Sequence, residues 1–307
     1  MNTQTHTTVD SSLDDIRGIY PMLYAFFDDK GGLDRAAMRR QVDGCIDAGC
    51  HGIAVGGLAT ETNKLSTAER RTLVEWVAEQ ITGRVPLSVT IAENNVAAQI
   101  EAVAHAAENG AAWVVLQPPP VRGASEEELI RFYGAVADAA TVPVGIQNAP
   151  DYIGIGLSNE GFATLNQSHP NAAIIKAEGP ATYIAGLAEA TGGAYKLLNG
   201  RNGLEHVDSL RAGCDGMVPG VETVDLHVAI FEAYASGDEA EADRIFARSL
   251  PLISFLMTSV DHLLCYGKRL AARRLGLSQP NDRAPAQQPT EFGLAVLDHW
   301  SRDLGDL

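Results

Sequence analysis

Cysteine is scarce in this sequence and forms no recognisable ligand pattern. Four cysteines occur among 307 residues, with no CxxC pair and no cluster with histidine. This spacing is not that of a zinc site or a redox motif. We therefore expect reduced, mostly buried thiols in a cytoplasmic protein. The four are Cys45, Cys50, Cys214 and Cys265.

Positive charge and long apolar runs are also lacking. The chain has 23 Lys and Arg against 39 Asp and Glu, a net charge of −16. This balance argues against nucleic acid and anionic membrane surfaces as partners. No apolar run reaches the ~18–20 residues of a membrane span. An anionic small-molecule substrate is still compatible, because one cationic site can lie in an acidic protein.

Several functional motifs are absent. No GxGxxG follows the first predicted strand, and there is no GxSxG or Walker-type loop. The eight histidines are scattered, and none lies beside a carboxylate pair at a predicted strand end. We therefore expect no metal site.

What the chain does contain is a regular alternation of strand-like and helix-like segments. Eight such units recur at a period near 25 residues, which predicts a (β/α)8 TIM barrel with a C-terminal helical extension. A doubly wound open sheet is the alternative, but the missing GxGxxG disfavours it. The predicted strands are Ile19–Phe26, Gly52–Gly57, Pro86–Ile91, Trp113–Leu116, Pro143–Gln147, Ala172–Gly179, Ala194–Leu198 and Gly216–Gly220.

The chain divides into three predicted regions. Residues 1–14 are polar and lack the features of a signal peptide, so we expect a disordered tail. The barrel is expected over residues 15–223, and helices packed on it over residues 224–307. The longest of these helices should run from Glu239 to Leu275 with a break near Pro251. The apolar side chains of this region are interpreted as core; a subunit contact is the alternative.

Helix starts carry clear capping signals. Asp34 should cap a helix that ends before Gly49. Ser66 and Glu69 match the capping-box pattern, in which each side chain binds the other residue's backbone. Ser125 and Ser158 mark two further starts.

Lys176 is the strongest candidate for chemistry. It follows the apolar run 172–175, near the C-terminal end of the sixth predicted strand, where TIM barrels place their catalytic groups. Burial favours the neutral amine, which can attack a ketone. The alternative is an edge lysine whose stem packs while its amine reaches water. Glu178 should face the same side, as a proton-transfer group or simply as an ion-pair partner.

Other polar residues also lie at predicted strand ends. Each has a simpler interpretation as a turn residue, a cap, a loop-backbone partner or barrel packing. They are Tyr24, Thr60, Glu61, Glu93, Asn94, Asn95, Gln147, Asn148, Asn199 and Arg201.

Together these residues resemble the dihydrodipicolinate synthase / N-acetylneuraminate lyase superfamily of class I Schiff-base lyases. The resemblance implies a TIM barrel, a homo-oligomer (often a tetramer) and a 2-keto acid bound as an imine on Lys176. No cofactor is needed, because the imine is the electron sink. The matching features are Gly57…Thr60-Glu61, Asn148-Ala149-Pro150, Ile174-Ile175-Lys176 and the Gly220 region.

The sequence departs from the synthases and aldolases of that superfamily. Gln147 occupies the place of a proton-shuttling tyrosine, and Pro120 and Tyr152 replace an expected tyrosine and arginine. An amide has no useful pKa for proton transfer. Gln147 with Lys176-Ala177-Glu178 is more similar to the 2-keto-3-deoxy sugar-acid (L-arabinonate-type) dehydratases.

The resemblance therefore implies a hydro-lyase that converts a 2-keto-3-deoxy sugar acid, such as 2-keto-3-deoxy-L-arabinonate, to 2-oxoglutarate semialdehyde. Lys176 and Glu178 would be catalytic, and Ala59 and Thr60 would hold the carboxylate. Glu61, Asn148 and Tyr24 are further expected substrate contacts, and Gln147 and Asn199 would bind substrate hydroxyls. Alternatives are an aldolase with Tyr24 as the phenol, a cyclic imino-acid deaminase, and a non-catalytic sugar-acid-binding barrel.

Overall fold

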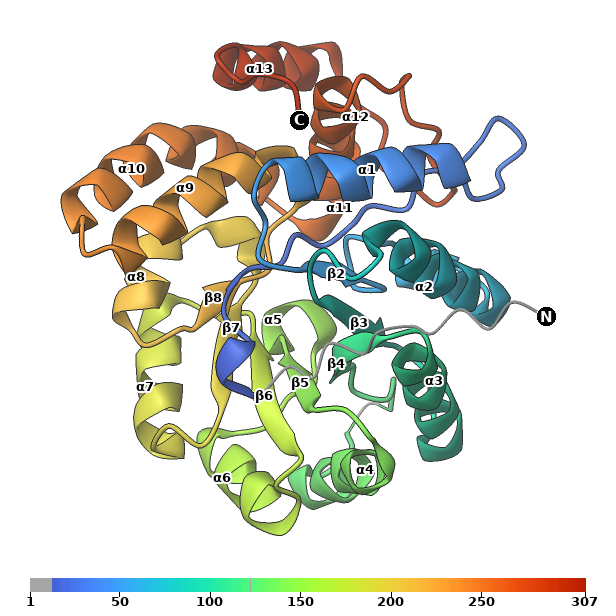
Figure 1. Ribbon diagram of the computed structural model, residues 1–307, viewed down its shortest axis with the longest axis vertical. Helices are drawn as coiled ribbons and strands as arrows, with labels where there is room; N and C mark the ends of the chain where they lie inside the picture. The colour runs from blue at the N-terminus through green and yellow to red at the C-terminus, as the bar shows by residue number, and fades with distance from the viewer. Residues whose placement is uncertain (1–12, 122) are drawn as a thin grey trace.

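The computed structural model describes residues 13–121 and 123–307. Within these residues, eight parallel strands form a sheet in the order β1-β8-β7-β6-β5-β4-β3-β2 (Figure 1). Met22 bridges to both Ala54 and Gly220 and so closes the sheet into a barrel. The (β/α)8 prediction is confirmed. The strands are β1 Gly18–Ile19, β2 Ile53–Val55, β3 Leu87–Ile91, β4 Ala111–Leu116, β5 Val144–Asn148, β6 Ala172–Ala177, β7 Lys196–Asn199 and β8 Gly216–Met217.

Helices surround this barrel, and their predicted caps are confirmed. Asp34 accepts a hydrogen bond from Ala37 N at 3.0 Å, and Ser66 and Glu69 form a complete capping box. The barrel helices are α1 Arg35–Asp47, α2 Thr67–Ile81, α3 Val96–Glu108, α4 Glu126–Ala139, α5 Pro150–Ile153, α6 Asn159–Ser168, α7 Ala181–Thr191, α8 His206–Arg211 and α9 Val224–Ala235. Short 3-10 turns span Leu13–Asp15, Thr62–Lys64, Arg201–Gly203 and Val221–Thr223.

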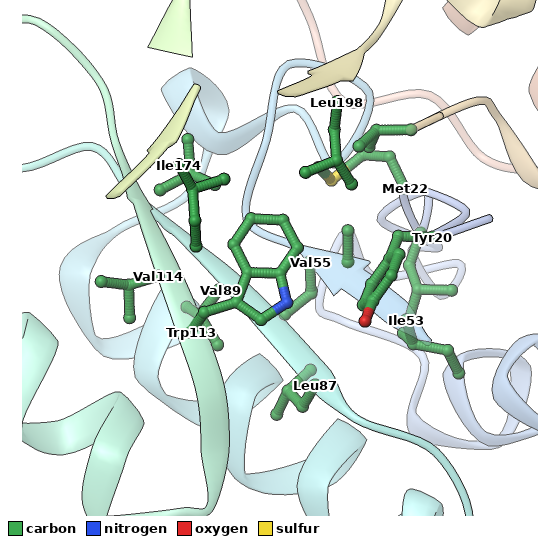
Figure 2. Packing of buried hydrophobic residues seen from close by; sticks show 14 of the residues in the cluster. Tyr20, Met22, Ile53, Val55, Leu87, Val89, Trp113, Val114, Ile174 and Leu198 are labelled. Atoms are coloured by element: carbon green, nitrogen blue, oxygen red, sulfur yellow. The ribbon is translucent and has the colours of Figure 1, made fainter. Parts of the chain in front are cut away.

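The barrel interior is filled by apolar side chains from different strands. Trp113 lies at its centre with its ring fully buried, and Tyr20 packs edge-on against it at 5.3 Å between ring centroids (Figure 2). Ile174 and Leu198 reach the same centre from β6 and β7. Polar groups at the strand ends therefore lie above a packed, dry core.

Strands β1 and β8 are shorter than predicted. After Ile19 the chain leaves regular pairing and contacts its neighbours through single bridges and bonds, such as Met22 N to Pro219 O at 2.7 Å. A proline at 21 and another at 219 lack the N–H that a longer ladder would need.

The predicted break at Pro251 is wrong. Pro251 lies inside α10 (Glu239–Leu256), and the chain turns by 100° only after Leu256. Ser259 caps the next helix by accepting from His262 N at 3.1 Å. One missing N–H is tolerated because Leu252, Ile253 and Leu256 anchor the same helix in the core. After the turn follow α11 Val260–His262, a π-helical turn Leu263–Gly267, α12 Lys268–Arg274 and α13 Glu291–Ser301.

The expected boundary at residue 223 falls inside a strand–helix unit. Helix α9 follows β8 and packs against α8 and β1, so it is the helix of the eighth strand–helix unit. The extension α10–α13 lies together along one side of the ring in Figure 1, and its buried side chains form a core of their own. Most of the expected tail, residues 1–12, lies outside the described residues, but Leu13 and Asp14 begin a 3-10 turn.

Among the described helices, none alone is long and apolar enough to span a membrane. The bent pair Glu239–Leu256 and Val260–Arg274 meets the length and composition criteria only when its two parts are taken together. Much of this pair is buried against the rest of the fold, including Leu252, Leu256 and Leu270.

One ion pair connects the loop before α13 to the start of α2. Arg283 donates to Glu69 Oε1 at 2.7 Å and to Oε2 at 3.1 Å. These bonds are the main reason that the pKa of Glu69 falls from 4.5 to about 2. Because the pKa is lower in the folded state, the pair stabilises the protein above pH 4.5, and this contribution is lost as the pH falls toward 2.

We predict that Glu69→Gln lowers the melting temperature at pH 7, and that the deficit shrinks as the pH falls from 4.5 toward 2. The matched control is Glu128→Gln, which changes the same capping-box position in α4, where the structure describes no hydrogen bond from an arginine. Thermal melts of the three proteins across this pH range measure the difference. Equal losses with the same pH dependence in both variants would mean that the ion pair with Arg283 adds nothing beyond the cap.

Candidate active site

Lys176 lies at the C-terminal mouth of the barrel. It is the fifth residue of β6 and pairs in register with Gln147 of β5 and Leu198 of β7. Only 5% of Lys176 is exposed, so its amine is largely removed from water. The position matches the sequence prediction, since an apolar strand carries this side chain to the end where barrels do chemistry.

The amine of Lys176 is joined to a chain of polar side chains. Its Nζ donates to Glu178 Oε1 at 2.6 Å. The same carboxylate oxygen accepts from Gln147 Nε2 at 2.9 Å, and Gln147 Oε1 accepts from Gln117 Nε2 at 3.0 Å. A proton can therefore pass directly between Lys176 and Glu178, while the two amides fix the orientation of the carboxylate.

Gly200 leaves the space that Glu178 occupies. A Cβ at position 200 would lie 2.9 Å from Glu178 Cγ and 3.0 Å from Cδ. The backbone N–H of Gly200 donates to Ala177 O at 3.0 Å, which ties the end of β7 to the end of β6. The absence of a side chain at 200 is thus needed for the carboxylate to reach the lysine.

Lys176 and Glu178 line a small pocket at this end of the barrel. No tyrosine lines this pocket among the described residues. Leu58 and Ala59 line it, and in the described structure their backbone N–H groups make no hydrogen bond. Two neighbouring free N–H groups suit a carboxylate. The other lining residues are Met22, Gly200, Arg201, Asn202, Val218, Pro219, Gly220, Met257, Val260 and Leu263.

Thr60 and Glu61 lie in the predicted loop, but protein partners occupy their side chains. The Thr60 hydroxyl donates to Leu23 O at 2.6 Å and accepts from Gly56 N at 3.0 Å. Glu61 is buried between two lysines, with Lys64 at 2.6 Å and Lys268 at 2.7 Å. Both residues therefore shape the loop that presents Leu58 and Ala59.

Tyr24 is fully buried and donates its hydroxyl to Glu222 Oε2 at 2.7 Å. Burial raises the pKa of Tyr24 well above 10, and the neighbouring carboxylate raises it further. Burial also raises the pKa of Glu222. The structure thus gives Tyr24 a protein partner, Glu222, in place of the substrate contact expected from the sequence.

The two asparagines at strand ends are also held by the protein. Asn148 donates to Leu157 O and Tyr183 Oη and accepts from Leu157 N. Asn199 donates to Gly179 O and Ser209 Oγ and accepts from Gly200 N. These bonds agree with the simpler interpretation of both residues as organisers of loops.

The described residues contain no group of three or more His, Cys, Asp or Glu side chains placed to hold a metal. The four cysteines are buried and unbonded. Burial raises the pKa of the Cys50 and Cys214 thiols to about 12, which makes them poor nucleophiles.

Comparison with known proteins agrees with this geometry. Residues 15–292 match the family described as the dihydrodipicolinate synthetase family. The chain belongs to this family. Its members are class I Schiff-base lyases, so this protein is an enzyme of that class, and the TIM barrel with C-terminal helices is the fold expected for it.

The relatives carry more than one activity in their names. A 4-hydroxy-tetrahydrodipicolinate synthase of Methanopyrus kandleri is 26% identical over 94% of this chain and 97% of its own. An L-2-keto-3-deoxyarabonate dehydratase of Azospirillum brasilense is 31% identical over 78% of this chain and 79% of its own. A prophage protein of the dihydrodipicolinic acid synthase family from E. coli K12, solved in complex with pyruvate, superposes with a TM-score of 0.85 at 25% identity, covering 94% and 98% of the two chains.

Sequence reasoning missed three residues of this site. Gln117 follows β4 directly and was detectable as a polar residue after an apolar run. The side chain of Leu58 is an unreactive hydrocarbon, so only its free backbone N–H indicates that the residue belongs to the site. Asn202 lines the pocket and donates to Glu222 Oε1 at 2.8 Å, a contact between distant segments that no local pattern signals.

We predict that Gly200→Ala slows imine formation on Lys176 by roughly 10- to 100-fold, because a small displacement of a catalytic group is costly. The added methyl group must push Glu178 from its place. The measurement is the rate at which borohydride traps pyruvate on Lys176. The matched control is Gly186→Ala in α7, where the nearest atom to a Cβ is 3.7 Å away. Trapping at the wild-type rate in a folded Gly200→Ala protein would contradict the role of this packing.

Proposed function

We propose that the enzyme dehydrates a 2-keto-3-deoxy sugar acid through an imine on Lys176. The observation that supports this best is the group beside the lysine. Glu178 contacts the amine, Gln147 holds Glu178, and no tyrosine lines the described pocket. A carboxylate can both remove a proton from carbon and return one to a leaving hydroxyl. An amide can do neither.

The free N–H groups of Leu58 and Ala59 support a site for the substrate carboxylate. We expected Ala59 and Thr60 to form this site, but Thr60 N donates to Gly57 O at 3.1 Å and its hydroxyl is also occupied. The proposal therefore moves the site one residue back along the loop. It places the substrate carboxylate on backbone N–H groups.

The proposed reaction starts with proton transfer from Lys176 to Glu178. The neutral amine adds to the C2 ketone, and loss of water gives an iminium ion. Glu178, again ionised, removes a proton from C3 and an enamine forms. The enamine expels the C4 hydroxyl, which takes a proton from Glu178 and leaves as water. Proton shifts along the remaining carbons and hydrolysis of the imine release the product, so the net change is loss of one water.

In this scheme Gln147 is a positioning residue. It donates to the oxygen of Glu178 that also contacts Lys176, and it is itself fully buried. The expected contact of Gln147 with substrate hydroxyls is replaced by this contact with Glu178. The Azospirillum relative, named as a dehydratase of a 2-keto-3-deoxy acid, adds support for this choice among the activities of the family.

We predict that Glu178→Gln loses 10²–10⁴-fold in dehydration rate, the range for a group that transfers protons at carbon. Gln147→Ala should lose less, because it removes only orientation. Gln147→Tyr should lower dehydration without creating pyruvate release. The assay follows product mass from a set of 2-keto-3-deoxy acids, and Lys176→Ala, which cannot form the imine, sets the zero point.

Two results would overturn this assignment. Rapid release of pyruvate by the wild-type enzyme would indicate an aldolase. Near-full activity of Glu178→Gln would show that another group moves the protons, even if Lys176 proves essential.

We also propose a homotetramer, because the family includes oligomeric enzymes. Of the apolar face predicted around Ile253, Phe255, Leu256, Leu263 and Leu264, three side chains are buried within one chain, and Phe255 and Leu264 are partly buried. Light scattering at micromolar concentration should give four times the 32.6 kDa of one chain. A mass near that of one chain would contradict the proposal.

A further inference from the structure

The turn after β7 has an unusual backbone. Arg201, Asn202 and Gly203 have φ angles of 52°, 51° and 70°, so three consecutive residues are left-handed. This region favours glycine, so a non-glycine residue held there is strained. Two such residues in succession, at the edge of the pocket that contains Lys176, need a structural cause.

Buried contacts hold this turn in place. Asn202 donates to Glu222 Oε1 at 2.8 Å, and its own Oδ1 accepts from Gly220 N at 2.6 Å. Glu222 is fully buried and is also bound by Tyr24. The network joins the segments that follow β1, β7 and β8, and it holds the turn whose residues Gly200, Arg201 and Asn202 line the pocket.

Arg201 has unused donors. Its NH1 donates to Glu205 Oε1 at 3.0 Å, whereas its Nε and NH2 groups make no hydrogen bond in the described structure. The backbone N–H groups of Arg201 and Asn202 are also without partners there. The other oxygen of Glu205 accepts from Ala181 N at the start of α7, so this carboxylate is shared between the arginine and a helix N-terminus.

The pocket thus holds two separate groups of anion-binding donors. One is the pair of N–H groups at Leu58 and Ala59, and the other is the guanidinium and N–H groups at Arg201 and Asn202. Lys176 and Glu178 line the same pocket as both groups of donors. A substrate with one carboxylate would use only one of them.

We propose that the preferred substrate carries a second anion at the end far from its keto acid group, a terminal carboxylate or phosphate bound by Arg201. This inference rests on the proposed function and narrows its substrate class. A guanidinium binds a carboxylate or a phosphate through two parallel hydrogen bonds, which a terminal hydroxyl cannot accept equally well.

The test compares three 2-keto-3-deoxy acids of equal carbon number that end in CH₂OH, carboxylate or CH₂-phosphate. For the wild type, kcat/KM should be highest for one of the two anionic ends. Arg201→Gln should lower kcat/KM for that substrate roughly 10- to 100-fold, the loss expected for a charge-assisted bond, and change the neutral substrate about two-fold or less. Arg201→Lys should recover part of the loss. Arg244→Gln, at an exposed arginine of α10, is the matched control.

The outcomes separate the two proposals. Two results would overturn the role of Arg201: an equal loss of kcat/KM on all three substrates in Arg201→Gln, or a higher wild-type kcat/KM for the neutral substrate. Dehydration could still be observed in either case. Pyruvate release from the anionic substrates, with the same dependence on Arg201, would support the second anion and overturn dehydration. The anionic substrate with the higher kcat/KM shows whether the second anion is a carboxylate or a phosphate.

Discussion

The buried contact between Lys176 and Glu178 is the constraint on which the rest of the site depends. Neither group can be left alone at this depth, because an unpaired buried charge is strongly disfavoured. Both lie in the apolar mouth of the barrel, with 5% and 6% of each residue exposed. The pair lets an amine and a carboxylate coexist there, and moving one proton between them creates a neutral nucleophile.

The surrounding residues serve this contact in different ways. Gln147 and Gln117 fix the carboxylate by hydrogen bonds, and Gly200 leaves room for it. The C-terminal extension acts from further away. Lys268 of α12 is fully buried, and although burial lowers its pKa, its ion pair with Glu61 holds the loop after β2. The helices beyond the barrel therefore help to shape the pocket, which explains why they pack against the barrel rather than project from it.

The proposed chemistry differs from that of a barrel with a tyrosine beside the lysine. A phenol can pass protons while an amide cannot, so in the proposed function Gln147 at the end of β5 leaves the proton transfers to Glu178. The same fold can thus support different reactions on an imine, and the choice depends on one or two side chains at strand ends.

The sequence alone determined the barrel. Apolar strands alternate with capped helices in a local pattern, and eight repeats of this pattern form a closed ring. It also determined that Lys176 and Glu178 face one side, since residues two apart in a strand do so. It could not give the partners of Tyr24, Thr60, Asn148 and Asn199, and it placed the break in the C-terminal helices at Pro251 rather than after Leu256. Tyr24 and Glu222 are 198 residues apart, and Glu61 and Lys268 are 207 apart. Only the tertiary structure decides which polar side chains face the pocket and which form hydrogen bonds with one another. A buried polar group needs a hydrogen-bond partner, and the closed barrel determines which groups lie within reach.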